Sequence, residues 1–156
     1  MLKQRGLEYV LVQALLIGMI LFGPRGFLLI PQSMAPWWPY LQVLGAIIGV
    51  LGLLLTLIAA LNLGKNLTPL PCPKDDAQLV QIGLYHFVRH PMYSGVLTVA
   101  CGWVLIYPHA LVLTYVVALF IFFELKTRRE ERWLKEKFPA YSEYCRQVKK
   151  FVPWIY

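Results

Sequence analysis

The segment LQVLGAIIGVLGLLLTLIAALNL, residues Leu41–Leu63, carries no charged side chain and decides the class of fold. A helix needs about 20 consecutive apolar residues to cross the hydrocarbon core of a bilayer, so this segment is long enough to cross it alone. Three further apolar segments accompany it, Leu7–Phe22, Tyr93–Tyr107 and Ala110–Leu125. We therefore predict an all-α integral membrane protein with four transmembrane helices.

The limits of these segments predict how the helices are joined. After the break GPR at residues 23–25, the first helix either ends at Phe22 or continues through Phe27–Ile30. That break is not a small-residue cleavage site, so we interpret the segment as a retained span and not as a signal peptide. Pro108 and His109 leave almost no loop between the third and fourth segments, which predicts a tight helical hairpin.

The composition supports a membrane location for the whole chain. Apolar residues make up 58% of the 156 residues and charged residues 15%, whereas soluble domains have roughly 45–50% and about 25%. The mean hydropathy is +0.58. A soluble protein of this size could not bury so much apolar surface, which excludes a disordered chain, a disulfide scaffold and a conventional soluble enzyme. The length is enough for a single domain, residues 1–156.

The distribution of positive charge predicts the orientation. The net charge is +7, with 15 Lys and Arg residues. If both termini are cytoplasmic, Lys3, Arg5 and every basic residue from Lys126 to Lys150 lie inside, and only Arg25 lies outside. We therefore expect a multi-pass protein with both termini cytoplasmic, in the inner membrane if the source is prokaryotic. The same distribution argues against a nucleic-acid partner, because the basic residues flank the most apolar segments.

Metal binding is not favoured by the sequence. The three cysteines form no CxxC pair and no Cys/His ligand set. His86 and His90 are four residues apart, a spacing that could hold a metal on a helix, but Pro91 pushes His90 out of the α region. We expect no metal site.

The fourth helix is expected to extend beyond the membrane. No Pro or Gly occurs from Ala110 to Phe138, and at 1.5 Å per residue this stretch reaches roughly 43 Å, against an apolar core of about 30 Å. Pro139 interrupts the helix, and Ala140–Val148 can form a further helical piece. Apolar positions recur across that join at helical spacing: Leu134, Phe138, Tyr141, Cys145 and Val148.

Two adjacent acids, Glu130 and Glu131, lie near this stripe. Glu130 is in phase with Leu134 and Phe138, whereas Glu131 is rotated by about 100°. We therefore expect Glu130 to face a specific ligand, and Glu131 to lie nearer the edge, where Lys135 offers an ordinary surface ion pair.

A surface role for both acids is an open alternative. In that alternative they form salt bridges with Lys126, Arg128 or Lys135. For Glu124, at the end of the fourth span, we favour a surface pair with Arg128, four residues further on.

Two motifs carry a resemblance to a known superfamily. The stretch GLYHFVRHPMYSG, residues 83–95, and an acidic pair followed by Leu, Phe, two Tyr and a late Pro are similar to the signatures of the isoprenylcysteine carboxyl methyltransferase and phospholipid methyltransferase superfamily. The resemblance covers about residues 64–154. The second motif consists of these residues: Glu130, Glu131, Leu134, Phe138, Tyr141, Tyr144 and Pro153.

This resemblance implies an integral membrane enzyme that uses S-adenosylmethionine. We therefore divide the single domain into two N-terminal spans, residues 1–63, which match the family only in character, and a catalytic portion, residues 64–156. The cofactor pocket is expected on the cytoplasmic side, capped by the loop before the third span and by the C-terminal helices. The cofactor-binding residues implied by the motifs are Ala77, Gln78, Leu79, Val80, Tyr85, His90, Pro91, Met92, Tyr93 and Glu130.

The resemblance also implies residues that act on the acceptor. We take Arg89 and Lys126 as candidate catalytic residues. The family has an arginine one turn before its cofactor-contacting acid, whereas this chain has Lys126 there, and Arg128 or Arg129 could substitute for it. The acceptor is expected to be a lipophilic or amphipathic molecule with a carboxylate, amine or thiol nucleophile.

Two other functions remain open at the level of sequence. One is an NADPH-dependent membrane reductase of the sterol-reductase type, although 156 residues leave little room for its nucleotide site. The other is a non-catalytic membrane adaptor, which would leave the acidic pair and the motif at residues 83–95 unexplained.

Overall fold

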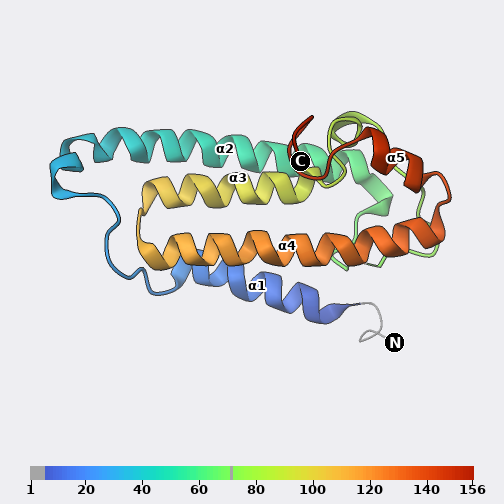
Figure 1. The fold of residues 1–156 in the computed structure, drawn as a ribbon, viewed down its shortest axis with the longest axis horizontal. Helices are drawn as coiled ribbons and strands as arrows, with labels where there is room; N and C mark the ends of the chain where they lie inside the picture. The colour runs from blue at the N-terminus through green and yellow to red at the C-terminus, as the bar shows by residue number, and fades with distance from the viewer. Residues whose placement is uncertain (1–5, 71) are drawn as a thin grey trace.

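The computed structural model describes residues 6–70 and 72–156, so Lys3 and Arg5 of the orientation argument lie outside the described residues. Four long helices alternate in direction along the long axis of the molecule (Figure 1). They are α1 (Leu7–Phe22), α2 (Trp38–Leu63), α3 (Pro91–Ile106) and α4 (Ala110–Lys137). Neither described range contains a strand. The shorter elements are the 3₁₀ turns η2 (Gln32–Trp37), η3 (Gly64–Asn66) and η4 (Gly83–His86), and the helix α5 (Tyr141–Gln147).

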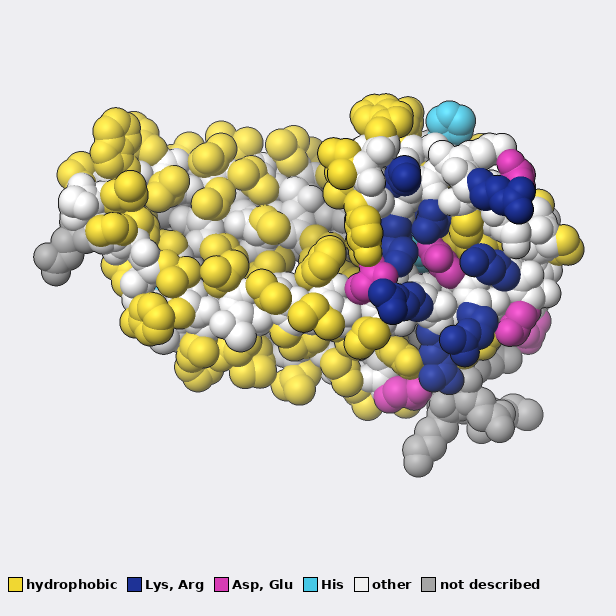
Figure 2. Space-filling model, viewed as in Figure 1, with side chains coloured by type: hydrophobic (Ala, Val, Ile, Leu, Met, Phe, Trp, Pro, Cys, Tyr) yellow, Lys and Arg dark blue, Asp and Glu magenta, His cyan; other side chains and the backbone are white. Residues whose placement is uncertain are grey.

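The surface of the bundle is that of a membrane protein. Helices α2 and α4 are long and apolar enough to cross a membrane, and α1 and α3 are apolar helices of 16 residues each. Apolar side chains cover most of the face in Figure 2, whereas Lys, Arg, Asp and Glu gather at one end. Helix α2 exposes Val43, Leu53 and Leu61 by 60% or more. Such a surface is stable only against lipid.

The segmentation predicted from the sequence is largely confirmed. Helix α1 ends at Phe22, so of the two alternatives the continuation through Phe27–Ile30 is wrong. Helix α2 begins at Trp38, three residues before the predicted Leu41, because Pro39 is compatible with the first turn of a helix. Helices α3 and α4 form the predicted hairpin, and α4 runs without a break to Lys137.

The segment after α1 is extended because its backbone groups bond to the start of α4. The amide of Leu29 donates to the carbonyl of Pro108 at 2.8 Å, and the amide of Ala110 donates to the carbonyl of Phe27 at 3.0 Å. The amide of Leu111 donates to the carbonyl of Arg25 at 3.1 Å. These bonds satisfy orphan groups at the N-terminus of α4 and fix the connection at this end of the bundle.

Helices α2 and α3 touch along their backbones. A β-carbon built on Gly52 would lie 2.6 Å from the amide nitrogen of Val99 and 2.7 Å from the carbonyl oxygen of Gly95. One built on Gly45 would lie 2.5 Å from the carbonyl oxygen of Gly102. Small residues that permit close backbone approach are the usual basis of helix packing in lipid, where no hydrophobic driving force acts between helices.

Helix α4 is the centre of the remaining core. Its residues Val116, Leu119 and Phe123 are buried against Ile20 of α1 and Ala100 of α3. The extension of α4 past Leu125 leaves the apolar band and carries the acidic pair. Because α5 follows after a turn at residues 138–140, the two helices fold around the charged end of the bundle (Figure 1).

We predict that Gly52→Ala lowers the stability of the protein by about 1–3 kcal/mol, because the added methyl group would overlap backbone atoms of α3 that cannot rotate away. Gly49→Ala is the matched control on the same helix, since a β-carbon there meets nothing within 4 Å. Thermal unfolding in detergent measures both. Equal stabilities of the two variants would contradict the proposed backbone contact.

Candidate functional site

A cavity of about 430 Å³ lies at the charged end of the bundle. Its volume is within the range of small-molecule sites, about 300–1,000 Å³. The walls come from the first half of α1, the end of α2, the loop between α2 and η4, the start of α3, the extension of α4, and α5. Segments far apart in the sequence therefore meet around one space.

The loop of residues 67–82 covers the cavity and is fastened by side chains at its base. Asn62 accepts a hydrogen bond from the amide of Leu84, and Asn66 accepts one from the amide of Gln78, both at 2.9 Å. At the far side, the ammonium of Lys137 donates to the carbonyls of Lys74 and Asp75. An irregular loop can thus cover the cavity without leaving these backbone groups unpaired.

Within residues 83–95 the backbone changes from a 3₁₀ turn to the helix α3, and this change determines where the side chains point. Residues 83–86 form a 3₁₀ turn, His90 has φ −126° and ψ 58°, and Pro91 begins α3. His86 consequently lies exposed and edge-on to Phe87, whereas His90 is buried and faces α4. The expected loss of helical register between the two histidines is confirmed.

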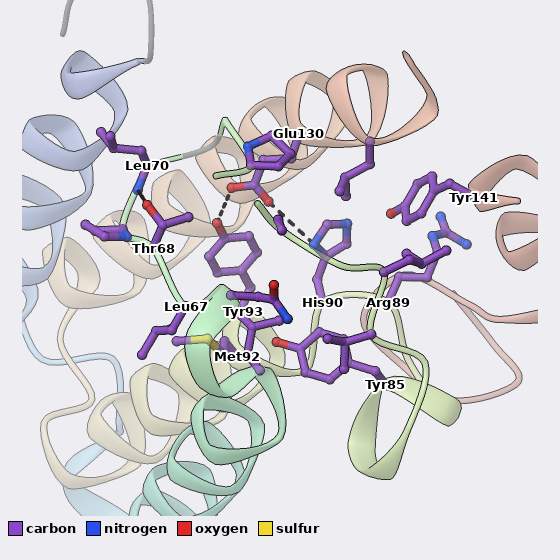
Figure 3. A pocket seen from close by; sticks show the side chains of 18 of the residues that line it. Leu67, Thr68, Leu70, Tyr85, Arg89, His90, Met92, Tyr93, Glu130 and Tyr141 are labelled. Carbon is purple, nitrogen blue, oxygen red and sulfur yellow. Dashed lines mark hydrogen bonds and ion pairs between the residues drawn. The ribbon is translucent and has the colours of Figure 1, made fainter. Parts of the chain in front are cut away.

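His90 stands between the two acids of α4, as Figure 3 shows for Glu130. Its Nε2 lies 3.1 Å from Oε1 of Glu131, and its Nδ1 lies 3.6 Å from Oε2 of Glu130. The hydroxyl of Tyr93 donates to Glu130, and the rings of His90 and Tyr93 stack with centroids 5.7 Å apart. The start of α3 and the residue before it thus contact the acidic pair of α4 directly.

The predicted surface pair between Glu131 and Lys135 is wrong. Glu131 accepts a hydrogen bond from Nε of Arg89 at 2.9 Å, and its side chain is only 13% exposed. The guanidinium of Arg89 also donates to the carbonyls of Cys145 and Val148. Glu131 therefore joins α4 to the loop before α3 and, through Arg89, to the end of α5.

The environments of the two acids push their pKa values apart. Burial disfavours the charge of Glu131, but the hydrogen bond with His90 and the charge of Arg89 outweigh burial and lower its pKa to about 2. Burial raises the pKa of Glu130, although His90, Tyr93 and Lys126 oppose this shift. The charge of Glu131 is thus compensated within the protein, whereas that of Glu130 is compensated incompletely.

Lys126 lies at the bottom of the cavity, on the side of α1. Its side chain is 2% exposed, and its ammonium donates to Oε1 of Gln13 at 2.7 Å. The ammonium also lies 5.0 Å from the centroid of the Tyr93 ring. An ammonium has three donors, and this is the one hydrogen bond that the described residues give it.

The cavity gathers most of the residues expected from the sequence. All of the candidate cofactor-binding residues line it except Pro91, which is buried as the first residue of α3. Both candidate catalytic residues, Arg89 and Lys126, also line it, whereas Glu131 does not.

The two alternatives to Lys126 do not reach the cavity. Arg128 pairs with Glu124 at 3.0 Å, as expected for that acid, and Arg129 lies over the rings of Tyr9 and Trp133. The second partner of Glu124, Lys150 at 2.7 Å, was not expected.

Several lining residues were missed by the sequence interpretation. The loop residues 67–70 and the helix residues Val10, Gln13 and Asn66 were not singled out as site residues. One signal could have indicated Gln13, because it is an uncharged polar side chain within an apolar segment, where polar groups usually face protein or a cavity. Tyr141 lines the cavity with its hydroxyl buried and without a hydrogen-bond partner among the described residues.

Comparison with known proteins agrees with this site. The signature of the phospholipid methyltransferase family matches residues 40–141. The chain belongs to this family. It is therefore a methyltransferase, and the resemblance inferred from the two motifs is confirmed.

Several curated proteins with a similar sequence are named as protein-S-isoprenylcysteine O-methyltransferases. A probable protein-S-isoprenylcysteine O-methyltransferase of Oryza sativa subsp. indica is 27% identical over 132 residues, which cover 82% of this chain and 68% of that protein. The protein-S-isoprenylcysteine O-methyltransferase of Saccharomyces cerevisiae is 34% identical over 118 residues, 72% of this chain and 49% of that protein. The Arabidopsis thaliana protein-S-isoprenylcysteine O-methyltransferase B is 30% identical, and the match spans 61% of it.

We predict that Glu131→Gln lowers the free energy of unfolding at pH 7 by about 3 kcal/mol, because a pKa shift of one unit corresponds to about 1.4 kcal/mol. The folded pKa of about 2 lies below the ordinary value of 4.5, so this stabilisation is complete above about pH 4.5. It is lost as the pH falls toward 2. Chemical unfolding between pH 7 and 2 should therefore show a steeper loss for the parent chain than for the variant.

The control for this prediction is Glu143→Gln. Glu143 pairs with Arg146, but both side chains are mostly exposed, at 60% and 80%. Exposed pairs contribute about 0–1 kcal/mol, so this variant should follow the pH dependence of the parent. If Glu131→Gln behaved like this control, Glu131 would not be the link between α4 and Arg89.

Proposed function

We propose that the protein transfers a methyl group from S-adenosylmethionine to a lipophilic or amphipathic acceptor at the cytoplasmic face of the membrane. The observation that carries the proposal is the carboxylate of Glu130, which faces the cavity among tyrosines with its charge incompletely compensated. A cationic ligand would supply the missing compensation. Family membership favours methyl transfer over the reductase and adaptor alternatives.

The lining fits the parts of the proposed cofactor. S-adenosylmethionine has a sulfonium, which makes its methyl group electrophilic, an amino-acid end and a ribose. The carboxylate of Glu130 can accept charge-assisted hydrogen bonds from an ammonium or bond ribose hydroxyls. The aromatic ring of Tyr85 can attract a sulfonium, whereas the ring of Tyr93 is stacked between His90 and Phe123. The buried hydroxyl of Tyr141 is a further polar group among the residues that line the cavity.

Lys126 is the residue that we propose for contact with the acceptor. It lies on the α1 side of the cavity, held by Gln13, and retains donors for an anionic group. The relatives are named as O-methyltransferases, which supports a carboxylate as the nucleophile. A carboxylate needs no general base, and its alignment with the methyl group accounts for much of the rate.

From the sequence, Arg89 is a candidate catalytic residue, whereas we now propose that it positions other residues of the site. Its guanidinium is engaged by Glu131 and by two carbonyls, so we assign it to positioning. It fixes Glu131, and Glu131 in turn fixes one nitrogen of the His90 ring beside the cavity.

The orientation that we propose places the cavity on the cytoplasmic side. The basic residues lie at the end of the bundle where α1 begins and α5 lies, and four crossings would bring both termini there (Figure 1). The excess of Lys and Arg at this end supports its cytoplasmic location. The acceptor would reach the cavity from the bilayer, because its apolar part remains in lipid.

The function can be tested with the purified full chain. It is incubated with S-adenosylmethionine labelled at the methyl group and with fractionated lipids of the host, and the labelled product is identified. We expect label in an amphipathic product that is hydrolysed by base, as a methyl ester would be. Label in a base-stable product would point to an amine or thiol acceptor. No transfer to any fraction, together with no binding of the cofactor, would contradict the proposal.

We predict that Glu130→Gln weakens the binding of S-adenosylhomocysteine by about 10- to 100-fold, because a lost charge-assisted hydrogen bond costs roughly 1.5–3 kcal/mol. Calorimetric titration measures the affinity. Glu131→Gln is the neighbouring control: measured at a temperature where that variant is folded, it should bind more tightly than Glu130→Gln, since Glu131 does not line the cavity. A larger loss of affinity at Glu131 would show that its link to His90 governs binding instead.

A further inference from the structure

The last residues of the chain form a compact turn with an unusual backbone. The amides of Phe151 and Val152 both donate to the carbonyl of Tyr156 at 2.8 Å, and the amide of Tyr156 donates to that of Val152 at 3.1 Å. Trp154 has φ 61°, a left-handed conformation that is rare for a bulky residue. We call residues 149–156 the C-terminal turn. The turn holds Trp154 and Ile155 outward, with exposures of 83% and 77%.

Two contacts fix the depth of the C-terminal turn along the bundle. The hydroxyl of Ser94, in the first turn of α3, donates to the carbonyl of Phe151 at 2.7 Å. The ammonium of Lys150 donates to Glu124 at 2.7 Å. Glu124 lies where the apolar part of α4 ends, and in Figures 1 and 2 the C-terminus lies near the transition from the apolar surface to the charged end. This is the depth of a membrane–water interface, where Trp side chains are enriched.

A cleft of about 240 Å³ lies beside the exposed Ile155. Its charged lining residues are Arg89, Lys149 and Lys150. Arg89 is paired with Glu131, and Lys150 with Glu124. Lys149 is exposed, and within the described ranges no ion pair holds its ammonium, so this positive charge is available to an anionic group.

We propose that this cleft binds the head group of an anionic phospholipid. The phosphate would meet the ammonium of Lys149, while Trp154 and Ile155 would lie among the upper parts of the acyl chains. The charge of the cleft, its interfacial depth and the outward apolar side chains each match one part of such a lipid. The proposal does not depend on the methyl-transfer reaction.

Such a lipid would also stabilise the loop beside the cavity. The backbone of the C-terminal turn pairs with the loop before α3. The amide of Arg89 donates to the backbone carbonyl of Lys149 at 2.8 Å, and the amide of His90 donates to the backbone carbonyl of Lys150 at 3.1 Å. A ligand that holds Lys149 in place favours this pairing. Bound lipid should therefore raise the thermal unfolding midpoint of the protein, since it binds the folded chain alone.

The test uses the full chain in a nonionic detergent, titrated with phosphatidylglycerol while the unfolding midpoint is followed. We expect the midpoint to rise with phosphatidylglycerol and to stay unchanged with phosphatidylcholine or inorganic phosphate. Lys149→Gln should weaken the apparent affinity about fivefold, the effect of one basic residue near an anionic surface. Lys65→Gln is the matched control, because Lys65 is an exposed lysine in η3 and is not among the residues that line the cleft.

A second measurement locates Trp154 in bilayers of phosphatidylcholine that carry bromine on the upper part of the acyl chains. The difference in emission between the parent and Trp154→Phe isolates this residue from the other four of the five tryptophans, and we expect that difference to be quenched. Three results would overturn the proposal: equal losses in the two lysine variants, an equal rise of the midpoint with inorganic phosphate, or unquenched Trp154 emission.

Discussion

The hydrogen-bonded ion pair between Arg89 and Glu131 is the constraint on which the charged end of the protein depends. It joins residues 42 positions apart, and the same guanidinium binds two carbonyls at the end of α5. The loop before α3, the polar extension of α4 and the end of α5 are therefore all joined through the carboxylate of Glu131 and the guanidinium of Arg89. Separating the two partners would leave a buried charge without compensation, which is strongly unfavourable. The ion pair therefore favours one arrangement of these segments over others. His90 is oriented as a consequence, since Glu131 holds one of its ring nitrogens.

Adjacent positions on one helix give the two acids separate roles. A rotation of about 100° directs Glu131 into contacts with the protein and Glu130 toward the cavity. The pKa of Glu131 is low because its partners favour the charged form, whereas burial raises that of Glu130. Pairs of neighbouring acids whose environments separate their pKa values are typical of functional sites. In this protein the separation distinguishes the acid that contacts other segments of the chain from the acid that lines the cavity.

The sequence predicted those parts of the structure that depend on local patterns. Apolar runs and the absence of Pro and Gly predicted the helices, including the extension of α4 to Lys137, and the motifs indicated most of the cavity lining. The partner of Glu131 could not be predicted, because Lys135 lies at a favourable helical spacing and only the tertiary fold brings Arg89 closer. The partner of Gln13 could not be predicted either, because Lys126 is 113 positions away in the sequence. Periodicity reports which face of a helix is buried, but not which distant segment covers that face.

The location of the cavity follows from the cost of polar groups in lipid. The loop of residues 67–82 is irregular, and irregular backbone is not tolerated against hydrocarbon. Charged side chains and such a loop can surround a cavity only where the helices leave the bilayer. The long helix α4 meets this requirement, since its apolar half packs against α1 and α3 while its polar half carries Lys126 and Glu130. A single rigid element thus spans the boundary that the proposed amphipathic acceptor would also span. The contact of Lys126 with Gln13 joins α4 to α1 at this boundary.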